Sequence, residues 1–523
     1  MNSSIGSNPT VDNALPMPLQ AALALAAGGI YPLAFAPFHW FPLLFVSVAV
    51  FWWLLNHAST QWALLAWVYG LGKYGVGVSW IYISIHQYGG ASPLLAGLMV
   101  ASFVGFMALF CLPIGWFVGA LKTSGRPLGR VALAMGFIAS WLLMEWLLTW
   151  FLTGFPWLFA GHAMLGTPLQ GFAPVFGALG LTLVAVLASL LLQVIADKTQ
   201  AVSYRGYAMG GLLLLAGLGL LLNSVSWVTS QGRYGVALVQ GDIDQAIKWD
   251  QDQRFVNVRK HMGLSAAHWD ADLLIWPEAA LTLFGRDARL ATQALHGQAQ
   301  SSQTNVIVGM PDVQRQTGEE AQFFNTVQAF GLAEGRFAKR HLVPFGEYVP
   351  LQDYLRGLIE FFDLPMSVAT PGPGQQPNIR LQLPGIQQPV EVASGICYEI
   401  AYGDTLRRQA ATSGVLLTVS NDTWFGGSIG PHQHMQIAQM RALENGRWLL
   451  RATNSGLTGV VNERGEITAQ LPQFEPAVLR AEFAVMLGTT PYAYLGDWPV
   501  LGVVLILLLM VLGRLRRALS ETN

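Results

Sequence analysis

Glu278, Lys339 and Cys397 are three residues of the carboxyl-terminal half whose types are suited to acyl chemistry. Glu278 closes the apolar run "LLIWPE", and Cys397 lies near the end of "PVEVASGICYE". Functional side chains in α/β folds tend to lie where strands end and loops begin. A thiolate is a nucleophile, a carboxylate can take its proton, and an ammonium can stabilise an oxyanion. Together these residue types favour catalysis by a cysteine nucleophile.

Each of the three residues also has an ordinary structural interpretation. A lone glutamate after a strand, or a lone lysine, is most often a solvated surface group. A free cysteine is often buried as a small hydrophobe. The chain has two cysteines, and the other, Cys111, falls within an apolar segment. We therefore expect no disulfide, and we interpret Cys111 as a core residue and Cys397 as a thiol of interest.

The segment that carries these residues has the pattern of a layered α/β domain, because short apolar runs alternate in it with helical patterns. The expected strands are residues 234–240, 271–278, 304–311, 389–399 and 414–422, and the expected helices are 251–267, 286–302 and 432–447.

The rest of the chain has the composition of a membrane protein. Of its 523 residues, 53% are hydrophobic and only 11% are charged, which is too apolar for an ordinary soluble protein. A formal net charge of −1 argues against nucleic acid as a partner, because there is no basic excess to neutralise phosphates. A bilayer core takes roughly 20 apolar residues per helix. The expected spans are residues 19–36, 40–57, 62–86, 94–121, 129–152, 170–196, 206–225 and 496–513.

The amino-terminal end leaves one alternative open. Only a turn containing Pro37 separates the first two expected spans, so they could instead form a hairpin that does not fully cross. Residues 1–18 have no basic region, and we expect no cleaved signal peptide.

The loops between the expected spans differ in their basic residues. Lys and Arg occur in 122–130, in 197–205 and after Gly513, whereas the loops near 37–41, 87–93 and 153–169 have none. The positive-inside rule places the basic loops in the cytoplasm and the α/β segment on the outer face. We therefore expect a membrane domain at 1–228, an outer catalytic domain at 229–488, and a last span with a cytoplasmic tail at 489–523.

The motifs around the three residues resemble those of the nitrilase (carbon-nitrogen hydrolase) superfamily. They read "IWPEAAL", "FAKRHLVPFGEYVP" and "SGICYEI", with 61 residues from Glu278 to Lys339 and 58 more to Cys397. The resemblance continues through "VSNDTWFG" and "QMRALENGRWLLRATNSGLTGVV". It implies an αββα sandwich with these three residues as the catalytic set.

A narrower resemblance covers nearly the whole chain. "KRHLVPFGEYVP", "CYE" and "NDTWFGGSIGPHQH", joined to seven preceding spans and one following, resemble the apolipoprotein N-acyltransferase family. The resemblance implies transfer of an acyl chain from a membrane phospholipid to the α-amino group of a diacylglyceryl-cysteine apolipoprotein, in a bacterial inner membrane with the catalytic domain in the periplasm. Cys397 would form a thioester in a ping-pong scheme, with Glu278 as base and Lys339 stabilising the oxyanion. No metal, nucleotide or other cofactor is implied.

Four further residues are candidates for a supporting role. Glu347, eight residues after Lys339, would orient that lysine or the base. Tyr398 and Glu399 flank the nucleophile, and Glu399 could equally accept structural hydrogen bonds from backbone donors. Trp249 resembles a family position in a loop over the site, but a lone aromatic residue also suits packing or an interfacial anchor.

Other polar residues are less specific. His432 and His434 form an H-x-H pair without a carboxylate or cysteine at ligand spacing, so we expect no metal site. Lys73 and Glu145 fall inside expected spans, where ionisable groups face a protein interior or a water-filled cavity; they could pair, or one of them could contact a phospholipid headgroup. We interpret 153–169 as a loop where a lipid enters, and 421–431 as Gly-rich enough to hinge.

Two other functions are compatible with parts of the pattern. A membrane-anchored nitrilase-type amidase would use the same three residues with water as acceptor, but it leaves the large lipid-facing base unexplained. A transporter with a degenerate nitrilase-like domain is disfavoured by the intact residue set and by the scarcity of charged residues in the spans.

Overall fold

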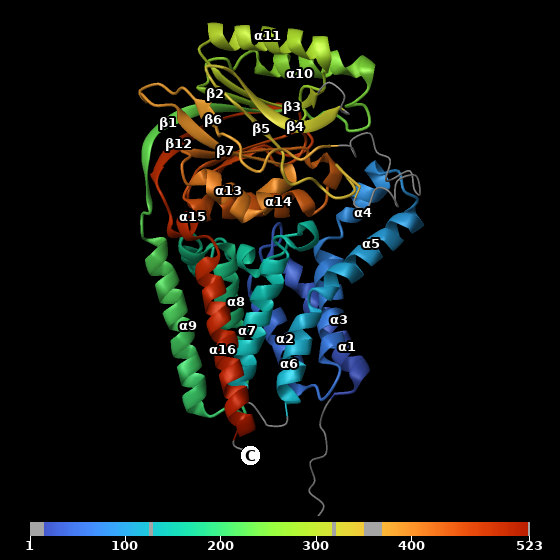
Figure 1. Cartoon of the computed structure of the whole chain (residues 1–523), viewed down its shortest axis with the longest axis vertical. Coiled ribbons are helices and arrows are strands. Elements are labelled where there is room, and N and C mark those ends of the chain that lie inside the picture. Colours follow the sequence, from blue (N-terminus) through green and yellow to red (C-terminus); the bar gives the residue numbers. More distant parts are fainter. Residues whose placement is uncertain (1–14, 125–128, 316–320, 350–368, 521–523) are drawn as a thin grey trace, which may run out of the picture.

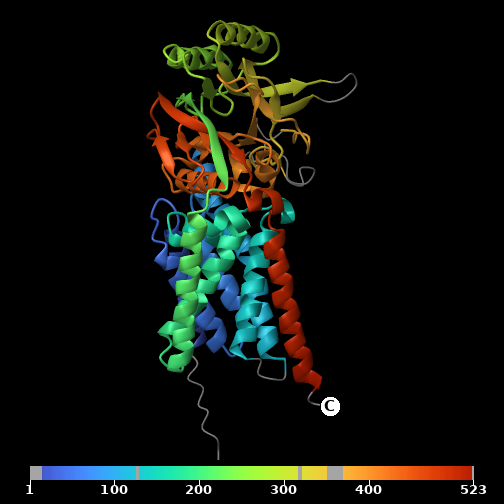
Figure 2. The ribbon, with the colours of Figure 1, turned by 90° about the vertical axis from the view of Figure 1, so that its left-hand side faces the viewer.

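The computed structural model describes residues 15–124, 129–315, 321–349 and 369–520, and it has a helical base beneath a two-sheet domain (Figure 1). Helices of the base run side by side in both views (Figures 1 and 2). The two sheets lie above them, stacked and separated from the base by further helices.

Each of the eight expected spans corresponds to a helical segment. Within the described residues, six segments are long and apolar enough to cross a bilayer. They are Met17–Ala34 (α1 Met17–Ile30 with η1 Tyr31–Ala34), Pro93–Lys122 (α5 Pro93–Leu109 with α6 Leu112–Lys122), Arg130–Leu147 (α7), Pro168–Ala196 (η5 Pro168–Phe172 with α8 Ala173–Ala196), Val202–Asn223 (α9) and Trp498–Arg517 in α16 (Trp498–Ser520).

The other two expected spans are shorter helices. α2 (Pro42–His57) and α3 (Trp62–Gly77) have 16 residues each, and at about 1.5 Å per residue such a helix is roughly 24 Å long. α3 packs against α1 at two glycines, because a Cβ at Gly28 would lie 2.0 Å from the Tyr69 carbonyl oxygen and one at Gly72 would lie 2.2 Å from that of Leu25. Small residues at such crossings let two helix backbones approach closely.

The sheet domain begins with β1 at Val228 and ends with β12 at Gly488. One six-stranded sheet has the order β12-β1-β2-β3-β4-β5, and the other has β11-β10-β9-β8-β7-β6. The strands of the first are β12 (Ala477–Gly488), β1 (Val228–Gln240), β2 (Leu273–Trp276), β3 (Asn305–Gln314), β4 (Gln322–Gly331) and β5 (Arg336–Ala338). Those of the second are β11 (Ile467–Gln470), β10 (Gly459–Val461), β9 (Leu449–Thr453), β8 (Val415–Ser420), β7 (Val390–Ile396) and β6 (Ile379–Leu381).

The centre of each sheet is parallel, with β1, β2 and β3 paired in one and β7, β8 and β9 in the other. The inner faces of the sheets share an apolar core that includes Val236, Ile275, Val392 and Val460. α10 (Arg254–Ser265) and α11 (Gly285–Ser301) cover the outer face of the first sheet, whereas α13 (Gly403–Ala410) and α14 (Gly430–Asn445) lie between the second sheet and the base (Figure 1). All five expected strands and all three expected helices of this region are present.

α14 joins the sheet domain to the helical base through polar side chains. Gln433 accepts hydrogen bonds from the indole Nε1 atoms of Trp80 (3.2 Å) and Trp157 (2.7 Å). Gln436 accepts from the backbone N of Ala36 and donates to the His162 carbonyl, each at 3.1 Å. The polar face of this helix is therefore bonded to the base and not solvated. One apolar cluster accordingly runs from the base through α14 to the second sheet.

Candidate active site

The three residues singled out from the sequence all follow strands. Glu278 comes two residues after β2, Lys339 directly after β5, and Cys397 directly after β7 as the first residue of the short helix η8 (Cys397–Ala401). β2 and β7 belong to different sheets. The site is therefore built where the carboxyl ends of strands from both sheets meet.

Lys339 lies between two buried carboxylates. Its Nζ is 2.7 Å from Glu347 Oε2 and 3.6 Å from Glu278 Oε1. The amide of Asn325, on β4, donates to Glu278 Oε1 at 2.7 Å and to Glu347 Oε1 at 3.1 Å. Asn325 and Lys339 thereby hold the two carboxylates in fixed positions around one ammonium.

Burial alone would lower the pKa of Lys339, but the carboxylates of Glu347 and Glu278 outweigh it and raise the pKa above its ordinary value. Opposite charges at this range favour the charged form of a buried group. Lys339 is therefore a permanent cation near neutral pH.

Cys397 is held in an unusual backbone conformation. Its φ is +53°, a region that non-glycine residues rarely occupy and that clusters at functional sites. The pKa of its thiol is raised to about 12. Burial is the main cause and Glu278 adds to it, whereas the Lys339 ammonium opposes them. At neutral pH the resting group is a thiol, so a base must take its proton before it can attack.

A buried hydrogen-bond network of His434, Asp422 and Arg451 holds the backbone at Cys397. His434 Nε2 lies 3.1 Å from the Cys397 carbonyl oxygen, and His434 Nδ1 lies 3.0 Å from Asp422 Oδ1. Arg451 donates to Asp422 Oδ2 at 2.6 Å. These three residues come from α14, from the short helix η9 (Asp422–Phe425) that follows β8, and from β9, so they tie η8 to the second sheet.

Family profiles and relatives match this architecture over almost its whole length. The carbon-nitrogen hydrolase profile matches residues 235–492, and the apolipoprotein N-acyltransferase N-terminal domain profile matches residues 27–191. The apolipoprotein N-acyltransferase of Pseudomonas aeruginosa (strain LESB58) is 43% identical over 497 residues, which cover 94% of this chain and 95% of its own. The chain belongs to the apolipoprotein N-acyltransferase family. The relative from Photobacterium profundum is 39% identical and covers 91% of both chains.

Among solved structures, Saccharomyces cerevisiae Nit3, a member of branch 10 of the nitrilase superfamily, is 16% identical with a TM-score of 0.36. It covers 50% of this chain and 92% of its own. The expected fold class, a helical membrane part with a nitrilase-type domain, is confirmed by the family profiles.

In this member of the apolipoprotein N-acyltransferase family, the two residues that follow Cys397 contact different parts of the molecule. Tyr398 contacts the helical base, and Glu399 contacts the loop after β5. Tyr398 is buried, donates to the Gly154 carbonyl at 3.2 Å and stacks near Trp157, with ring centroids 6.4 Å apart. The Glu399 carboxylate accepts from the backbone N atoms of Ile396 (2.9 Å), Arg340 (2.7 Å) and His341 (3.1 Å). Burial raises the pKa of Glu399, against the effect of these donors. Glu399 therefore links the Lys339 loop to η8.

Lys248 is a buried residue of the site that the sequence analysis did not single out. Its Nζ donates to the backbone carbonyl of Glu278 at 3.0 Å, and burial lowers its pKa to about 8. Its neighbour Trp249 is half-buried and lies 6.4 Å from the Phe284 ring, centroid to centroid. The one feature of the sequence that could have indicated Lys248 is its position next to Trp249, which was already a candidate.

The two ionisable residues of the base that the sequence singled out, Lys73 and Glu145, contact other residues and not each other. Glu145 accepts from Trp141 Nε1, the Ala160 backbone N and Thr182 Oγ1, whereas Lys73 Nζ lies 4.7 Å from the centre of the Tyr31 ring. Lys73 and Glu145 make no ion pair with each other. The expected loop 153–169 is largely buried beneath η8 and α14. Cys111 and Cys397 are both free, as expected.

Proposed function

We propose that this protein transfers an acyl chain from a membrane phospholipid to the α-amino group of a diacylglyceryl-cysteine apolipoprotein. The observation that carries the proposal is the Cys397 thiol on a strained turn beside the Glu278–Lys339–Glu347 cluster. Membership of the apolipoprotein N-acyltransferase family supports it. So does the helical base, because donor and acceptor are both lipids of the bilayer.

In the first half-reaction, the Cys397 sulfur attacks the ester carbonyl carbon of the donor while Glu278 takes the thiol proton. The negative charge moves to the carbonyl oxygen, where the Lys339 ammonium stabilises it. The C–O bond then breaks, and the proton held by Glu278 goes to the leaving oxygen. The products are a lysophospholipid and a thioester at Cys397.

In the second half-reaction, Glu278 takes a proton from the incoming α-amine, which attacks the thioester carbonyl. The C–S bond breaks, the amide forms and the thiol is regenerated. The scheme is ping-pong. Glu347 would fix the position of Lys339, Glu399 and Tyr398 would hold the turn at the nucleophile, and Trp249 would belong to a loop over the site.

We place the protein in a bacterial inner membrane with the sheet domain in the periplasm. Four basic residues support this orientation: Lys122 ends α6, Arg130 begins α7, Arg205 lies in the first turn of α9, and Arg514 lies towards the end of α16. These helix ends lie at the end of the base opposite the sheets (Figure 1), where the positive-inside rule expects the cytoplasm. The domain limits follow from it: a membrane domain at 1–228, a catalytic domain at 229–488 and a last span with its tail at 489–523.

The experiment that tests the proposal is intact mass spectrometry after incubation with phospholipid alone. The wild-type protein should gain the mass of one acyl chain, and hydroxylamine should remove it, because thioesters are labile to this nucleophile. Cys397→Ser should form no thioester. A folded wild-type protein that gains no acyl mass from phospholipid, but does gain one from a small amide, would support the amidase alternative.

A further inference from the structure

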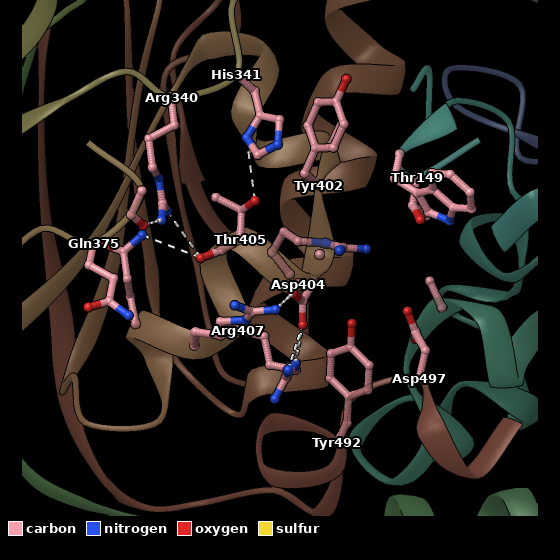
Figure 3. A pocket seen from close by; sticks show the side chains of 18 of the residues that line it. Thr149, Arg340, His341, Gln375, Tyr402, Asp404, Thr405, Arg407, Tyr492 and Asp497 are labelled. Carbon is pink, nitrogen blue, oxygen red and sulfur yellow. Dashed lines mark hydrogen bonds and ion pairs between the residues drawn. The ribbon is translucent and has the colours of Figure 1, made fainter. Parts of the chain in front are cut away.

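A cavity lies beside the proposed catalytic cluster. It has a volume of about 1020 Å³ and is lined by residues of the base and of the sheet domain. Glu278, Lys339 and Cys397 do not line it, but Arg340 and His341, the two residues after Lys339, do. Figure 3 shows these two side chains on one wall of the cavity, with Tyr402, Thr405 and Asp404 near them. The Lys339–His341 loop therefore separates two sites.

The cavity wall has more guanidinium groups than carboxylates to pair with them. Arg407 and Arg408 share the single carboxylate of Asp404, at 2.5 and 2.6 Å. Among the described residues, the guanidinium of Arg340 donates to two backbone carbonyl oxygens, those of Gly374 (3.0 Å) and Thr405 (3.3 Å), and pairs with no carboxylate. The Arg408 side chain is 74% exposed, so its remaining donors are open to a ligand. Guanidinium groups arranged in this way suit the oxygens of a phosphate.

Asp497 gives the cavity a carboxylate, whose charge is opposite to that of the arginines. It lines the cavity next to the start of α16, and its carboxylate has no hydrogen-bond or ion-pair partner among the described residues. Burial raises its pKa to about 6, with Asp404 adding to the effect and Arg441 and Arg407 opposing it. Near neutral pH this carboxylate would gain from a cationic group. A ligand that satisfies both features carries a phosphate and an ammonium.

The lower rim of the cavity lies where the spans end. Trp146 and Trp150 at the end of α7, and Trp498 at the start of α16, line it. Trp150 is 51% exposed and Trp498 is 75% exposed, and exposed tryptophans mark the bilayer–water interface. Further along α16, Leu505 and Leu509 are also exposed. A molecule bound at the arginines can thus extend acyl chains along α16 into the bilayer.

We propose that this cavity binds the headgroup of a zwitterionic phospholipid, with its phosphate between Arg340 and Arg408 and its ammonium near Asp497. This site is separate from the thiol and does not depend on acyl transfer. Because Arg340 and His341 donate their backbone N–H groups to Glu399, a bound lipid would also hold the loop that carries Lys339.

Photocrosslinking tests the site directly. The full-length Cys397→Ala protein, which cannot form the thioester, is placed in lipid nanodiscs containing a phosphoethanolamine lipid with a photoreactive headgroup. After illumination, crosslinked peptides are mapped by mass spectrometry. Crosslinks should fall in residues 401–409 and 491–501. Arg340→Gln/Arg408→Gln should lower their yield about tenfold, a change of about 1.4 kcal/mol, and the exposed Arg408→Gln alone should lower it severalfold.

The matched control is Arg464→Gln, an exposed arginine paired with Glu463 at 3.9 Å, which should leave the yield unchanged. Excess inorganic phosphate should compete weakly, because it lacks the acyl chains and the ammonium. Full competition by free phosphate would assign the site to that ion and overturn the lipid proposal. The proposal would also be overturned if crosslinks were absent from both segments, or if the crosslink yield of the arginine variants equalled that of the Cys397→Ala protein with its arginines intact. None of these outcomes depends on whether the wild-type enzyme forms a thioester.

Discussion

At the scale of single residues, the site places one ammonium between two carboxylates and next to a thiol. Each of the carboxylates favours the charged lysine, and Glu278 also disfavours the thiolate. A thiol that stays protonated at rest is protected from reaction with other electrophiles. In the proposed mechanism, the nucleophile is generated when Glu278 takes the thiol proton during the attack on a bound ester.

Alkylation of Cys397 measures this balance of charges. In a Cys111→Ala background, the rate of reaction with iodoacetamide should rise about tenfold per pH unit between pH 7 and 10, because the pKa of Cys397 is raised to about 12. A plateau near the ordinary cysteine pKa of about 8.5 would contradict this. Lys339→Met removes the charge that lowers the pKa and should slow alkylation at fixed pH. Glu278→Gln removes a charge that raises it and should speed alkylation.

Acylation should respond to Glu278 in the opposite direction. Glu278→Gln cannot accept the thiol proton, so thioester formation from phospholipid should fall by roughly 10²- to 10⁴-fold, as for other general bases. Glu347→Gln should cost less, because Glu278 remains to pair with Lys339. Glu482→Gln, at a carboxylate whose side chain is 70% exposed, is the control in a rapid-quench assay. Equal losses for the Glu278 and Glu347 variants would argue against Glu278 as the base.

The sequence predicted the site residues that follow strands more readily than those that complete the hydrogen-bond network around Glu278. Glu278, Lys339 and Cys397 were found because their types, order and surrounding motifs occur together. Lys248 and Asn325 were not found, since neither a lysine in a loop nor an asparagine within a strand has a distinguishing local pattern. Their contacts with Glu278 join residues 30 and 47 positions apart in the chain. Only the folded sheets bring them together.

At the scale of elements, the turn at Cys397 depends on α14 and β9. The strained φ of +53° persists where surrounding structure fixes it, and here His434 contacts the Cys397 carbonyl while Asp422 and Arg451 hold His434. Helix 432–447 was predicted from Ile437, Met440 and Leu443 on one face. The role of its polar face could not be predicted, because Gln433 and Gln436 form hydrogen bonds with residues of the base that lie hundreds of positions earlier in the chain.

Breaking the buried pair beneath the turn should destabilise the protein. Arg451→Met removes the cationic partner of the buried Asp422 carboxylate and leaves it bonded to Ser420 and His434, which should cost about 3–5 kcal/mol, measured by thermal unfolding in detergent. Arg480→Met removes a partner of the exposed Asp270 and should cost about 0–1 kcal/mol.

The pH dependence of the free energy of unfolding follows from the carboxylate of Asp422. Burial would raise its pKa, but Arg451 and His434 outweigh burial and lower it. The stability from this group is present above the unfolded pKa of about 3.9 and is lost as pH falls towards the folded value. The Arg451→Met variant should therefore lose less stability than the wild type on acidification below about pH 4. A loss of equal size in both proteins would remove Asp422 as the cause.

At the scale of the whole molecule, base and sheet domain share one apolar core. Trp157 of the base, Met440 of α14 and Leu416 of β8 belong to the same cluster. The hydropathy of the chain could predict the spans, and alternation could predict the strands, because both are local patterns. The docking of one part on the other is a long-range property. It largely buries the loop 153–169, which the sequence alone led us to interpret as a loop where a lipid enters.

Such a fixed arrangement makes the orientation in the membrane testable with two single cysteines. In a Cys397→Ala background, Ser301→Cys lies at the end of α11 on the sheet domain, and Thr199→Cys lies between α8 and α9 at the opposite end; both positions are exposed. Cys111, which remains, is buried.

In intact spheroplasts, a membrane-impermeant maleimide should label only the Ser301→Cys protein, because that side faces the periplasm in our proposal. After lysis, both proteins should be labelled, which controls for reactivity. The reverse pattern would invert the topology and place the thiol of Cys397 in the cytoplasm. There it could not meet an apolipoprotein presented on the outer face. The orientation and the proposed acceptor therefore stand or fall together in this measurement.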